Sequence, residues 1–552
     1  MKLFFKIFLS LYCLAPITVL AQDDWDTDGE IEDVEVEIVK DRDIKLPNAS
    51  RNFDKIPSLD TSDKEQDLTY FYNTLPVNLP KLDLRIRPLR IKDQPLQKLY
   101  GNYVKAGYGN YNTPYFEGYV NNKRNKTYSY GAHINYLNSQ RGPVDDENSG
   151  SGSLDVETFG KAFGKKATLS GDLGYHRNNY HFYGYDEGIE VDADSIKQVF
   201  NRFNSSVALE NTRTDDAIQY KMGLNYNYLS DDYSDRESEF GASFLASYAF
   251  SDETSFNLSG DLALISREAE SFDRNRTFFR FRPVVKFTAY DFIVEAGFNA
   301  VYENDTLRDG EELHFYPLIQ AKYKLTDYFE VYAGISGDVE KQTLNSLTRE
   351  NPFLQQNQAI FHTNKTFDFY GGINGRLSSK IGFKAGISIA NYQNLHYFIN
   401  DSTDQSRFLA VFDDENTAVV NLFGALSWST GGFSTSVRGD YWGYDASDAI
   451  GGEAWHRPNY KLSVLSGYNF NDKILLNADL YSVGGIKALD TESGEEVSLD
   501  ALIDLNLKVD YLVSDQVSAF VQLRNIFGQE YELLYRYPSR QFQFMAGITY
   551  SF

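Results

Sequence analysis

The 552-residue sequence has little cysteine, few methionines and no long apolar runs beyond its first twenty residues. Cys13 is the single cysteine, so a disulfide framework is excluded. Past residue 20 no apolar stretch approaches the ~18 residues that a membrane helix requires, which excludes a helical membrane protein. Basic residues are outnumbered 53 to 78, and the net charge of −25 speaks against nucleic acid as a partner.

Aromatic residues are abundant instead. The chain holds 40 Tyr, 40 Phe and 4 Trp, and 42% of its residues are hydrophobic. Such a composition can bury a large surface, so neither a disordered nor a collagen-like chain is indicated.

The first 21 residues have the pattern of a secretory signal peptide. Lys2 and Lys6 provide the positive start, an apolar stretch follows, and Ala21 ends a small-residue cleavage site. We therefore expect export, with a mature chain that begins at Gln22.

Residues 22–43 are strongly acidic, and a segment of this composition does not collapse on its own. Within it, apolar and acidic residues alternate as in a short strand, which would suit addition to the sheet edge of a periplasmic partner. The alternative is a solvated acidic tail. The candidate partner-binding residues are Val34, Glu35, Val36, Glu37 and Ile38.

Residues 44–98 are interrupted by prolines, which predicts an extended segment without long helices or central strands. Its last part, 81–98, is basic and precedes an acidic body, so electrostatic attraction between the two is expected. The residues predicted to contact the body from the inside are Arg85, Arg87, Arg90 and Lys92.

From residue 99 to 552 stretches of strict two-residue alternation follow one another, separated by Gly, Asn, Asp or Ser. In 499–511 an apolar face with Leu505, Leu507 and Val509 alternates with a polar face that carries Asp504 and Lys508. Charged second faces, aromatic clusters near strand ends and stretches of 9–11 residues or more are typical of transmembrane β-barrels. We predict an all-β, antiparallel up-and-down barrel of about 22 strands in the outer membrane, in contact with its lipid.

The connections between these stretches alternate between short and long, as such a barrel requires. Short turns are predicted at 251–253, 289–291, 326–327, 430–432, 471–472 and 514–515. Long loops are predicted at 140–152, 186–197, 266–275, 303–311, 344–365, 400–407, 445–458 and 488–497.

Catalytic motifs are missing from the sequence. The seven histidines show no paired metal spacing, and neither HExxH nor GxSxG is present. We therefore predict no enzyme, no catalytic residues, no metal site and no cofactor. Acidic groups at 192–194, 231–232 and 413–415 are interpreted as solvated loop tips rather than calcium sites.

The C-terminal part resembles a known family. Asn525-Ile526-Phe527 followed by Tyr531, ahead of a last strand that ends in an aromatic residue, is similar to the end of TonB-dependent receptor barrels. The resemblance implies solute transport across the outer membrane and a TonB box at residues 34–38. It also implies a C-terminal signal for the barrel-insertion machinery at Ile548, Tyr550 and Phe552.

The sequence departs from this family in one respect. TonB-dependent receptors carry a folded plug domain, whereas residues 40–98 are too short and too rich in proline to form one. The segment either obstructs the lumen as a reduced plug, or the barrel has another use. The alternatives are a membrane scaffold, adhesin or assembly subunit, which a surface lipoprotein would accompany, and an open diffusion porin.

Overall fold

The computed structural model describes residues 100–552, apart from 124, 187, 214–215 and 305–311. Strands dominate this part of the chain. They are β1 (Asn102–Gly109), β2 (Thr113–Asn121), β3 (Tyr128–Ser139), β4 (Ser151–Phe163), β5 (Ala167–His181), β6 (Lys197–Asn211), β7 (Ile218–Ser230), β8 (Arg236–Ala249), β9 (Thr254–Glu268), β10 (Asp273–Ala289), β11 (Phe292–Glu303), β12 (Glu312–Thr326), β13 (Phe329–Glu340), β14 (Thr363–Ser378), β15 (Ile381–Asn400), β16 (Phe408–Thr430), β17 (Phe433–Asp445), β18 (Tyr460–Phe470), β19 (Ile474–Gly484), β20 (Lys487–Leu489), β21 (Glu496–Ser498), β22 (Leu502–Leu512), β23 (Val517–Arg524) and β24 (Gln543–Ser551).

The few helical turns are short. They are η1 (Asp146–Ser149), η2 (Ala193–Ile196), α2 (Leu344–Glu350) and η3 (Asp448–Ile450). In the part of the chain that the structure describes, no helix has the length and apolar character needed to cross a membrane.

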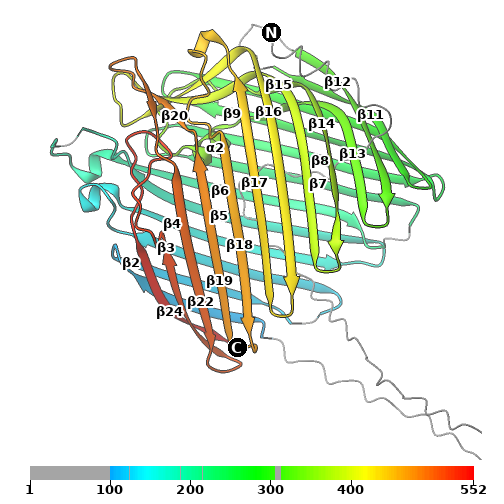
Figure 1. Cartoon of the computed structure of the whole chain (residues 1–552), viewed down its shortest axis with the longest axis horizontal. Helices are drawn as coiled ribbons and strands as arrows, with labels where there is room; N and C mark the ends of the chain where they lie inside the picture. The colour runs from blue at the N-terminus through cyan, green and yellow to red at the C-terminus, as the bar shows by residue number, and fades with distance from the viewer. Residues whose placement is uncertain (1–99, 124, 187, 214–215, 305–311) are drawn as a thin grey trace, which may run out of the picture. The chain divides into compact units, whose positions relative to one another are not determined.

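The strands form one closed antiparallel barrel (Figure 1). Its sheet has 22 strands, and β20 and β21 make a separate hairpin. Successive strands of the large sheet pair with each other, and β24 pairs with β1 from Tyr103 opposite Ser551 to Gly109 opposite Met545. Closure satisfies the backbone groups that a sheet edge would expose. The predicted fold class and strand number are therefore confirmed.

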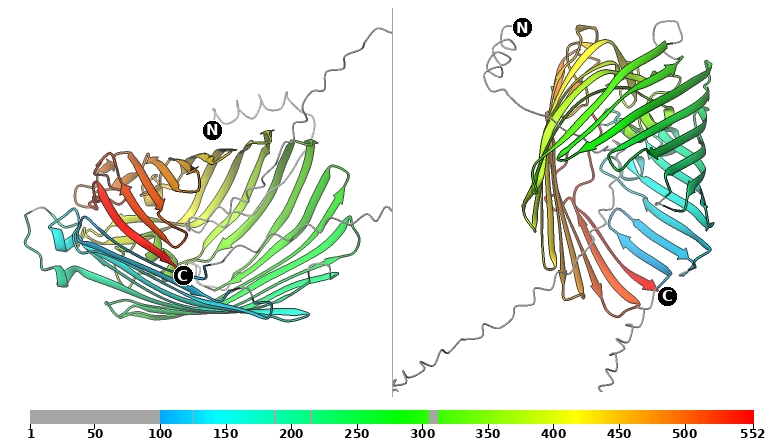
Figure 2. Two further views of the ribbon diagram at one scale, coloured as in Figure 1. Left: turned by 90° about the horizontal axis from the view of Figure 1, so that it is seen from below. Right: turned by 90° about the vertical axis from the view of Figure 1, so that its right-hand side faces the viewer.

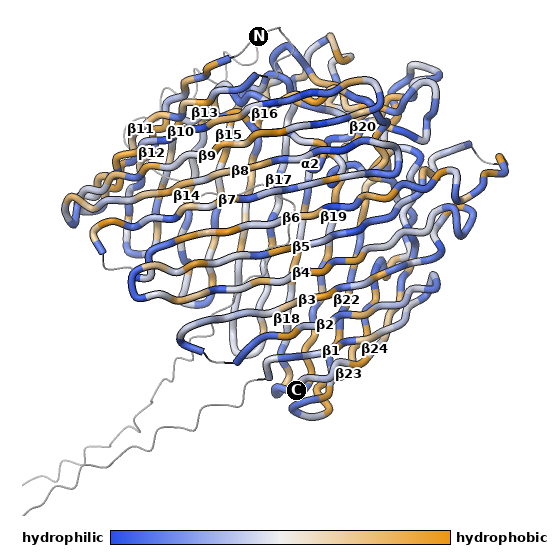
Figure 3. Tube along the Cα trace, turned by 180° about the vertical axis from the view of Figure 1, so that it is seen from behind, coloured by the Kyte–Doolittle hydropathy of each residue, from blue (hydrophilic) through white to orange (hydrophobic). Residues whose placement is uncertain are grey.

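Side chains alternate between the two faces of this wall. In β22 the outward positions include Ile503 and Tyr511, both about half exposed, whereas Lys508 and Asp510 on the inward face form an ion pair of 3.1 Å. Figure 3 shows the resulting alternation of hydrophobic and hydrophilic positions along the strands. The strand predicted over 499–511 begins at Leu502 instead, because β20 and β21 lie within the connection that precedes it.

The two rims differ in the length of their connections. At the terminal rim, defined here as the rim where β1 begins and β24 ends, connections such as 290–291 and 431–432 are tight turns. At the distal rim, the opposite one, the connections include 341–362, 446–459, 485–501 and 525–542. Figure 2 shows the strands around their common axis in two further views. The predicted short turns and long loops fall on opposite rims, as expected, except that most of the loop predicted at 303–311 lies outside the described residues.

Candidate functional site

The connection between β13 and β14, residues 341–362, is called the mouth segment below. It contains α2, whose N-terminus is fixed by a capping box. The Thr343 hydroxyl accepts the Ser346 N–H at 3.0 Å, and the Ser346 hydroxyl accepts the Thr343 N–H at 2.9 Å. The helix ends at Glu350, and Pro352 keeps the preceding residue, Asn351, out of helical geometry. Local sequence thus determines a two-turn helix inside a long connection.

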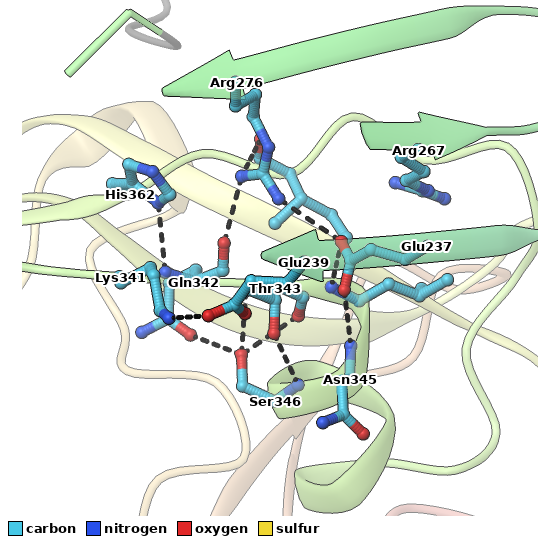
Figure 4. Close-up of polar contacts among 12 residues, drawn as sticks. Glu237, Glu239, Arg267, Arg276, Lys341, Gln342, Thr343, Asn345, Ser346 and His362 are labelled. Atoms are coloured by element: carbon cyan, nitrogen blue, oxygen red, sulfur yellow. Dashed lines mark hydrogen bonds and ion pairs between the residues drawn. The ribbon is translucent and has the colours of Figure 1, made fainter. Parts of the chain in front are cut away.

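A buried carboxylate of the barrel wall receives the start of this helix. Glu237, near the beginning of β8, accepts the N–H groups of Leu344 at 2.9 Å and Asn345 at 3.2 Å. Its side chain is 4% exposed and also forms an ion pair of 3.4 Å with Arg276 of β10. Figure 4 shows Glu237 between the helix start and the Arg276 guanidinium. A negative charge at a helix N-terminus is favourable because the first N–H groups lack partners within the helix.

Two buried arginines hold the backbone of the same segment. Arg276 donates to the carbonyl oxygen of Gln342 at 2.9 Å and to that of Ile360 at 3.4 Å. It therefore holds the segment both before and after α2. Arg267 of β9 donates to the carbonyl of Gln358 and forms a two-pronged ion pair with Asp235. Charged groups buried in this way are stable only with full sets of partners, so the contacts fix the segment in one position.

The wall beside these arginines adds further polar contacts. Arg202 of β6 donates to the side chains of Asn345 at 2.8 Å and Thr348 at 3.0 Å, and Lys341 pairs with Glu239. Among these groups lies a cavity of about 30 Å³, which is room for about one water molecule.

The other end of the helix binds a different part of the barrel wall, at β15. Glu350 accepts a hydrogen bond of 2.8 Å from the His396 ring of β15. Partial burial alone would raise the pKa of Glu350, but the hydrogen bond and the charges of His396 and Arg457 outweigh it and lower this pKa to about 2. Farther on, the Phe408 N–H of β16 donates to the Phe353 carbonyl at 2.9 Å. The mouth segment is therefore anchored on both walls.

Aromatic rings fill the space between these anchors. Phe353 stacks on Tyr537 of the 525–542 connection at 3.8 Å between ring centroids, and Tyr183 meets Phe353 at 5.8 Å. The buried members of this mouth cluster are Phe182, Phe200, Leu229, Leu344, Leu347, Phe353, Leu354, Ile360, Phe398, Phe408 and Tyr537. Burial of large aromatic side chains stabilises such a cluster by a few kcal/mol per residue, on the order of 1.5–3 each.

The cluster joins strands that stand across the ring from one another. Half of the ring separates β5 from β16, yet the Arg407 guanidinium just before β16 lies 4.4 Å from the Phe182 ring just after β5. A third connection is tied in by His456, which contacts the carbonyl of Phe398 at 2.7 Å and accepts the Tyr535 N–H at 3.2 Å. Burial lowers the pKa of His456 to about 4, so it is neutral at pH 7. The distal connections thus meet across the lumen at this mouth of the barrel.

None of the site residues predicted from the sequence is among the mouth contacts described above. Residues 34–38 and the basic positions 85, 87, 90 and 92 lie outside the described residues. Ile548 and Tyr550 face outward on β24 and are 60% and 47% exposed, and Phe552 follows the strand at the terminal rim. This placement suits contact with lipid or with another protein and assigns no role by itself.

The interpretation of 413–415 as a solvated loop tip was wrong for Asp413 and for the backbone, which is part of a strand, although Asp414 and Glu415 are exposed. Asp413 lies within β16, is 1% exposed, and accepts hydrogen bonds from Ser447 at 2.6 Å and Thr417 at 2.7 Å. Its carboxylate anchors the 446–459 connection. The reason is that β16 extends well beyond the length needed to cross a membrane, so its first residues form part of the wall of the mouth.

Sequence reasoning predicted a long connection at 344–365 but identified neither its helix nor the residues that anchor it. The signal for α2 was present in Thr343, Ser346 and Pro352, but the partners Glu237 and Arg276 looked like ordinary polar positions of alternating strands. Only the barrel brings them against the mouth segment. Along the chain, Glu237 precedes its partner in this segment by about a hundred residues and Arg276 by about seventy.

Comparison of the sequence with protein-family models and with curated proteins found no match. Comparison of the structure with solved structures did. The FrpB iron transporter from Neisseria meningitidis aligns at a TM-score of 0.66 with 10% identity over 83% of this chain and 82% of that one. The ferric-catecholate import receptor Fiu from Escherichia coli K12 aligns at 0.62 with 11% identity, covering 83% and 82%. The siderophore receptor PirA from Acinetobacter baumannii aligns at 0.61 with 11% identity, covering 82% and 80%.

These likenesses define the class of fold. The chain is a 22-strand barrel similar to those of bacterial iron and siderophore receptors, as the resemblance of its C-terminal residues indicated. This fold points to the outer membrane as its location.

Proposed function

We propose that this protein is an outer-membrane receptor that captures a solute at its distal rim and passes it through the barrel, with the mouth segment as the gate on the outer side. The observation that carries the proposal is a receptor-type barrel whose anchored distal connections meet across its mouth, where we infer that they close it. The structural relatives named above include an iron transporter and an import receptor, which supports transport of a solute.

The closed mouth argues against the open diffusion porin. A porin needs a continuous water-filled path, whereas here the rings of Tyr183, Phe353 and Tyr537 and the Arg407–Phe182 contact lie across the mouth. Passage of a solute then requires the mouth segment to leave its anchors on at least one wall.

The N-terminal part of the chain completes the proposal. Residues 1–21 direct export, residues 34–38 pair with TonB or another periplasmic protein, and residues 44–98 obstruct the lumen from the terminal rim. Support comes from the sequence pattern of these segments, in particular from the basic stretch 81–98 that precedes an acidic body. The residues at 548, 550 and 552 are proposed to be read by the barrel-insertion machinery.

A second candidate is a scaffold or a subunit of an outer-membrane assembly, with a surface lipoprotein as the partner to look for. It is favoured by the density of buried ion pairs at the mouth, because Glu237–Arg276 and Asp235–Arg267 make opening costly. A barrel closed permanently by such contacts would present its connections without conducting.

Planar-bilayer conductance separates these functions. Four proteins are compared: the mature chain, the same chain without residues 22–98, the mature chain with Phe353→Ala and Arg276→Ala, and the combination of both changes. Altered gel migration on boiling confirms that each barrel is folded. A gated receptor predicts large conductance only when both obstructions are removed.

The other outcomes are equally distinct. Equal and large conductance in all four proteins would establish a porin, and the mouth segment would have no role as a gate. Negligible conductance even in the combined variant would favour the scaffold.

A further inference from the structure

Three potential metal ligands converge at the distal ends of β11 and β12. The His314 Nε2 atom lies 3.3 Å from a carboxylate oxygen of Glu303 and 3.5 Å from one of Glu312. One donor atom from each of the three residues lies within 4.8 Å of the others. None of these residues takes part in the mouth contacts described above.

Strand register explains this convergence. Glu303 is paired with Glu312 and Val301 with His314 in the antiparallel ladder. Because alternate residues of a strand share a face, Glu303, Glu312 and His314 all lie on the inward side of the wall, with His314 diagonal to Glu303. The backbone therefore sets the three side chains together, and any ligand bound there would sit at the mouth of the lumen.

The distances suit a divalent ion of the first transition row. Zinc bound tetrahedrally by imidazole nitrogen and carboxylate oxygen at 2.0–2.2 Å places its ligand atoms roughly 3.4 Å apart. Both distances from His314 Nε2 are close to that value. Two carboxylates also balance the charge of a divalent ion, and imidazole favours transition metals over calcium or magnesium.

The neighbouring side chains hold the His314 ring in place and leave the site open to water on one side. The Tyr316 ring, on the next inward position of β12, stacks on His314 at 6.0 Å and 14° between planes. Exposure of the side chains rises from 3% for Glu303 through 13% for His314 to 42% for Glu312. An ion would thus have protein ligands on the wall side and water on the other.

A second histidine of the inward wall provides the comparison. His133 lies 3.3 Å from Glu117, the same separation, but Lys105 occupies the other side of that carboxylate at 3.6 Å. The lysine supplies the positive charge there. At His314 a second carboxylate, that of Glu312, lies 3.5 Å from the ring and adds a second negatively charged ligand.

We propose that Glu303, Glu312 and His314 form a binding site for a divalent transition-metal ion, represented here by Zn²⁺, at the distal rim. The site goes beyond the proposed function and does not depend on it, since a scaffold could carry it equally well.

The test uses the full mature chain in detergent, stripped with a chelator and titrated with Zn²⁺ against a chromophoric competitor. We expect one equivalent that is lost or weakened at least ~100-fold in His314→Ala, since even changes behind the ligands cost 10–100-fold. Glu312→Gln, at the most exposed ligand, should weaken binding without disturbing the fold. His133→Ala is the matched control and should bind as the parent does.

Cobalt provides a second readout that does not depend on transport. Co²⁺ in the parent should give a visible ligand-field spectrum that His314→Ala abolishes and His133→Ala retains. The proposal is overturned if His314→Ala and Glu312→Gln both leave the Zn²⁺ affinity and the Co²⁺ spectrum unchanged. The triad would then be an ion pair of a histidine with its neighbouring carboxylates.

Discussion

The terminal and distal rims of the barrel terminate the same strands in opposite ways. At the terminal rim, turns such as 431–432 reverse the chain with local backbone geometry, and Gly431 has a φ of +57°. At the distal rim, connections more than ten residues long contact each other, and their side chains are buried with strand residues such as Phe200 and Glu237. The difference teaches that one rim needs only turn chemistry, whereas the other has a core of its own, so substitutions should affect them differently.

The largest effect is expected for Arg276→Ala. Removal of this guanidinium leaves the buried Glu237 without its ion-pair partner, and breaking a buried ion pair typically costs about 3–5 kcal/mol. Hydrogen exchange of residues 343–362 should accelerate accordingly, because Gln342 and Ile360 also lose their donor. Lys380→Ala, which removes an exposed contact to Thr430 at the terminal rim, is the control and should leave this exchange unchanged. Equal exchange rates in the two variants would show that Arg276 does not hold the mouth segment in place.

Phe353→Ala tests the apolar half of the same closure. The ring is 8% exposed and stacks on Tyr537, so its loss should cost about 3 kcal/mol and open the mouth segment to protease. Phe250→Ala is the matched change at the terminal rim, where the ring is 64% exposed, and should alter stability by less than ~0.5 kcal/mol. Similar protease sensitivity in both variants would contradict the presence of a separate distal core.

The Glu350–His396 contact predicts a pH dependence confined to the distal rim. A carboxyl whose pKa is lowered to about 2 stabilises the folded mouth fully above the ordinary pKa of about 4.5, and this contribution is lost as the pH falls from there toward 2. Because half of the Glu350 side chain is exposed, solvent limits the effect to about 1 kcal/mol. Protection factors of 343–362, which are exchange rates corrected for the intrinsic pH dependence, should be lower at pH 3 than at pH 5 in the parent, and Glu350→Gln should abolish this difference in protection. A pH effect that persists in Glu350→Gln would assign it to another group.

An effect of similar size, but without consequence for the mouth, is expected at a terminal turn. Gly431→Ala meets no neighbouring atom but must adopt a positive φ, which costs roughly 1 kcal/mol in global unfolding. Gly424→Ala, equally open but in ordinary strand geometry, should cost nothing measurable. Neither variant should change exchange at the mouth. A faster exchange of 343–362 in Gly431→Ala would show that the two rims are coupled.

Much of the wall was predictable because its signal repeats. Alternation of apolar and polar residues is set by the strand itself. Positions such as Ile503, Lys508 and Tyr511 could therefore be assigned to the outward or inward face without knowledge of the neighbouring strands. Turn residues such as Gly431 and Asn471 mark reversals by their own backbone preferences.

The mouth was not predictable in the same way. Glu237 and Arg276 follow the same alternation as every other polar inward residue, and nothing local distinguishes a charge that faces water from one that binds a helix start. The triad at Glu303, Glu312 and His314 was missed for a related reason: its spacing has meaning only once the register of β11 and β12 is known.

The sequence by itself determined an antiparallel barrel with about 22 strands, its inward and outward faces and the rims to which its connections belong, because strand alternation and turn chemistry act over a few residues. Only the tertiary structure decided that the distal mouth is closed, which buried charges anchor the mouth segment, and where three metal ligands meet. Those features depend on strands brought face to face across the ring, and such distances are fixed by closure of the barrel rather than by any local pattern.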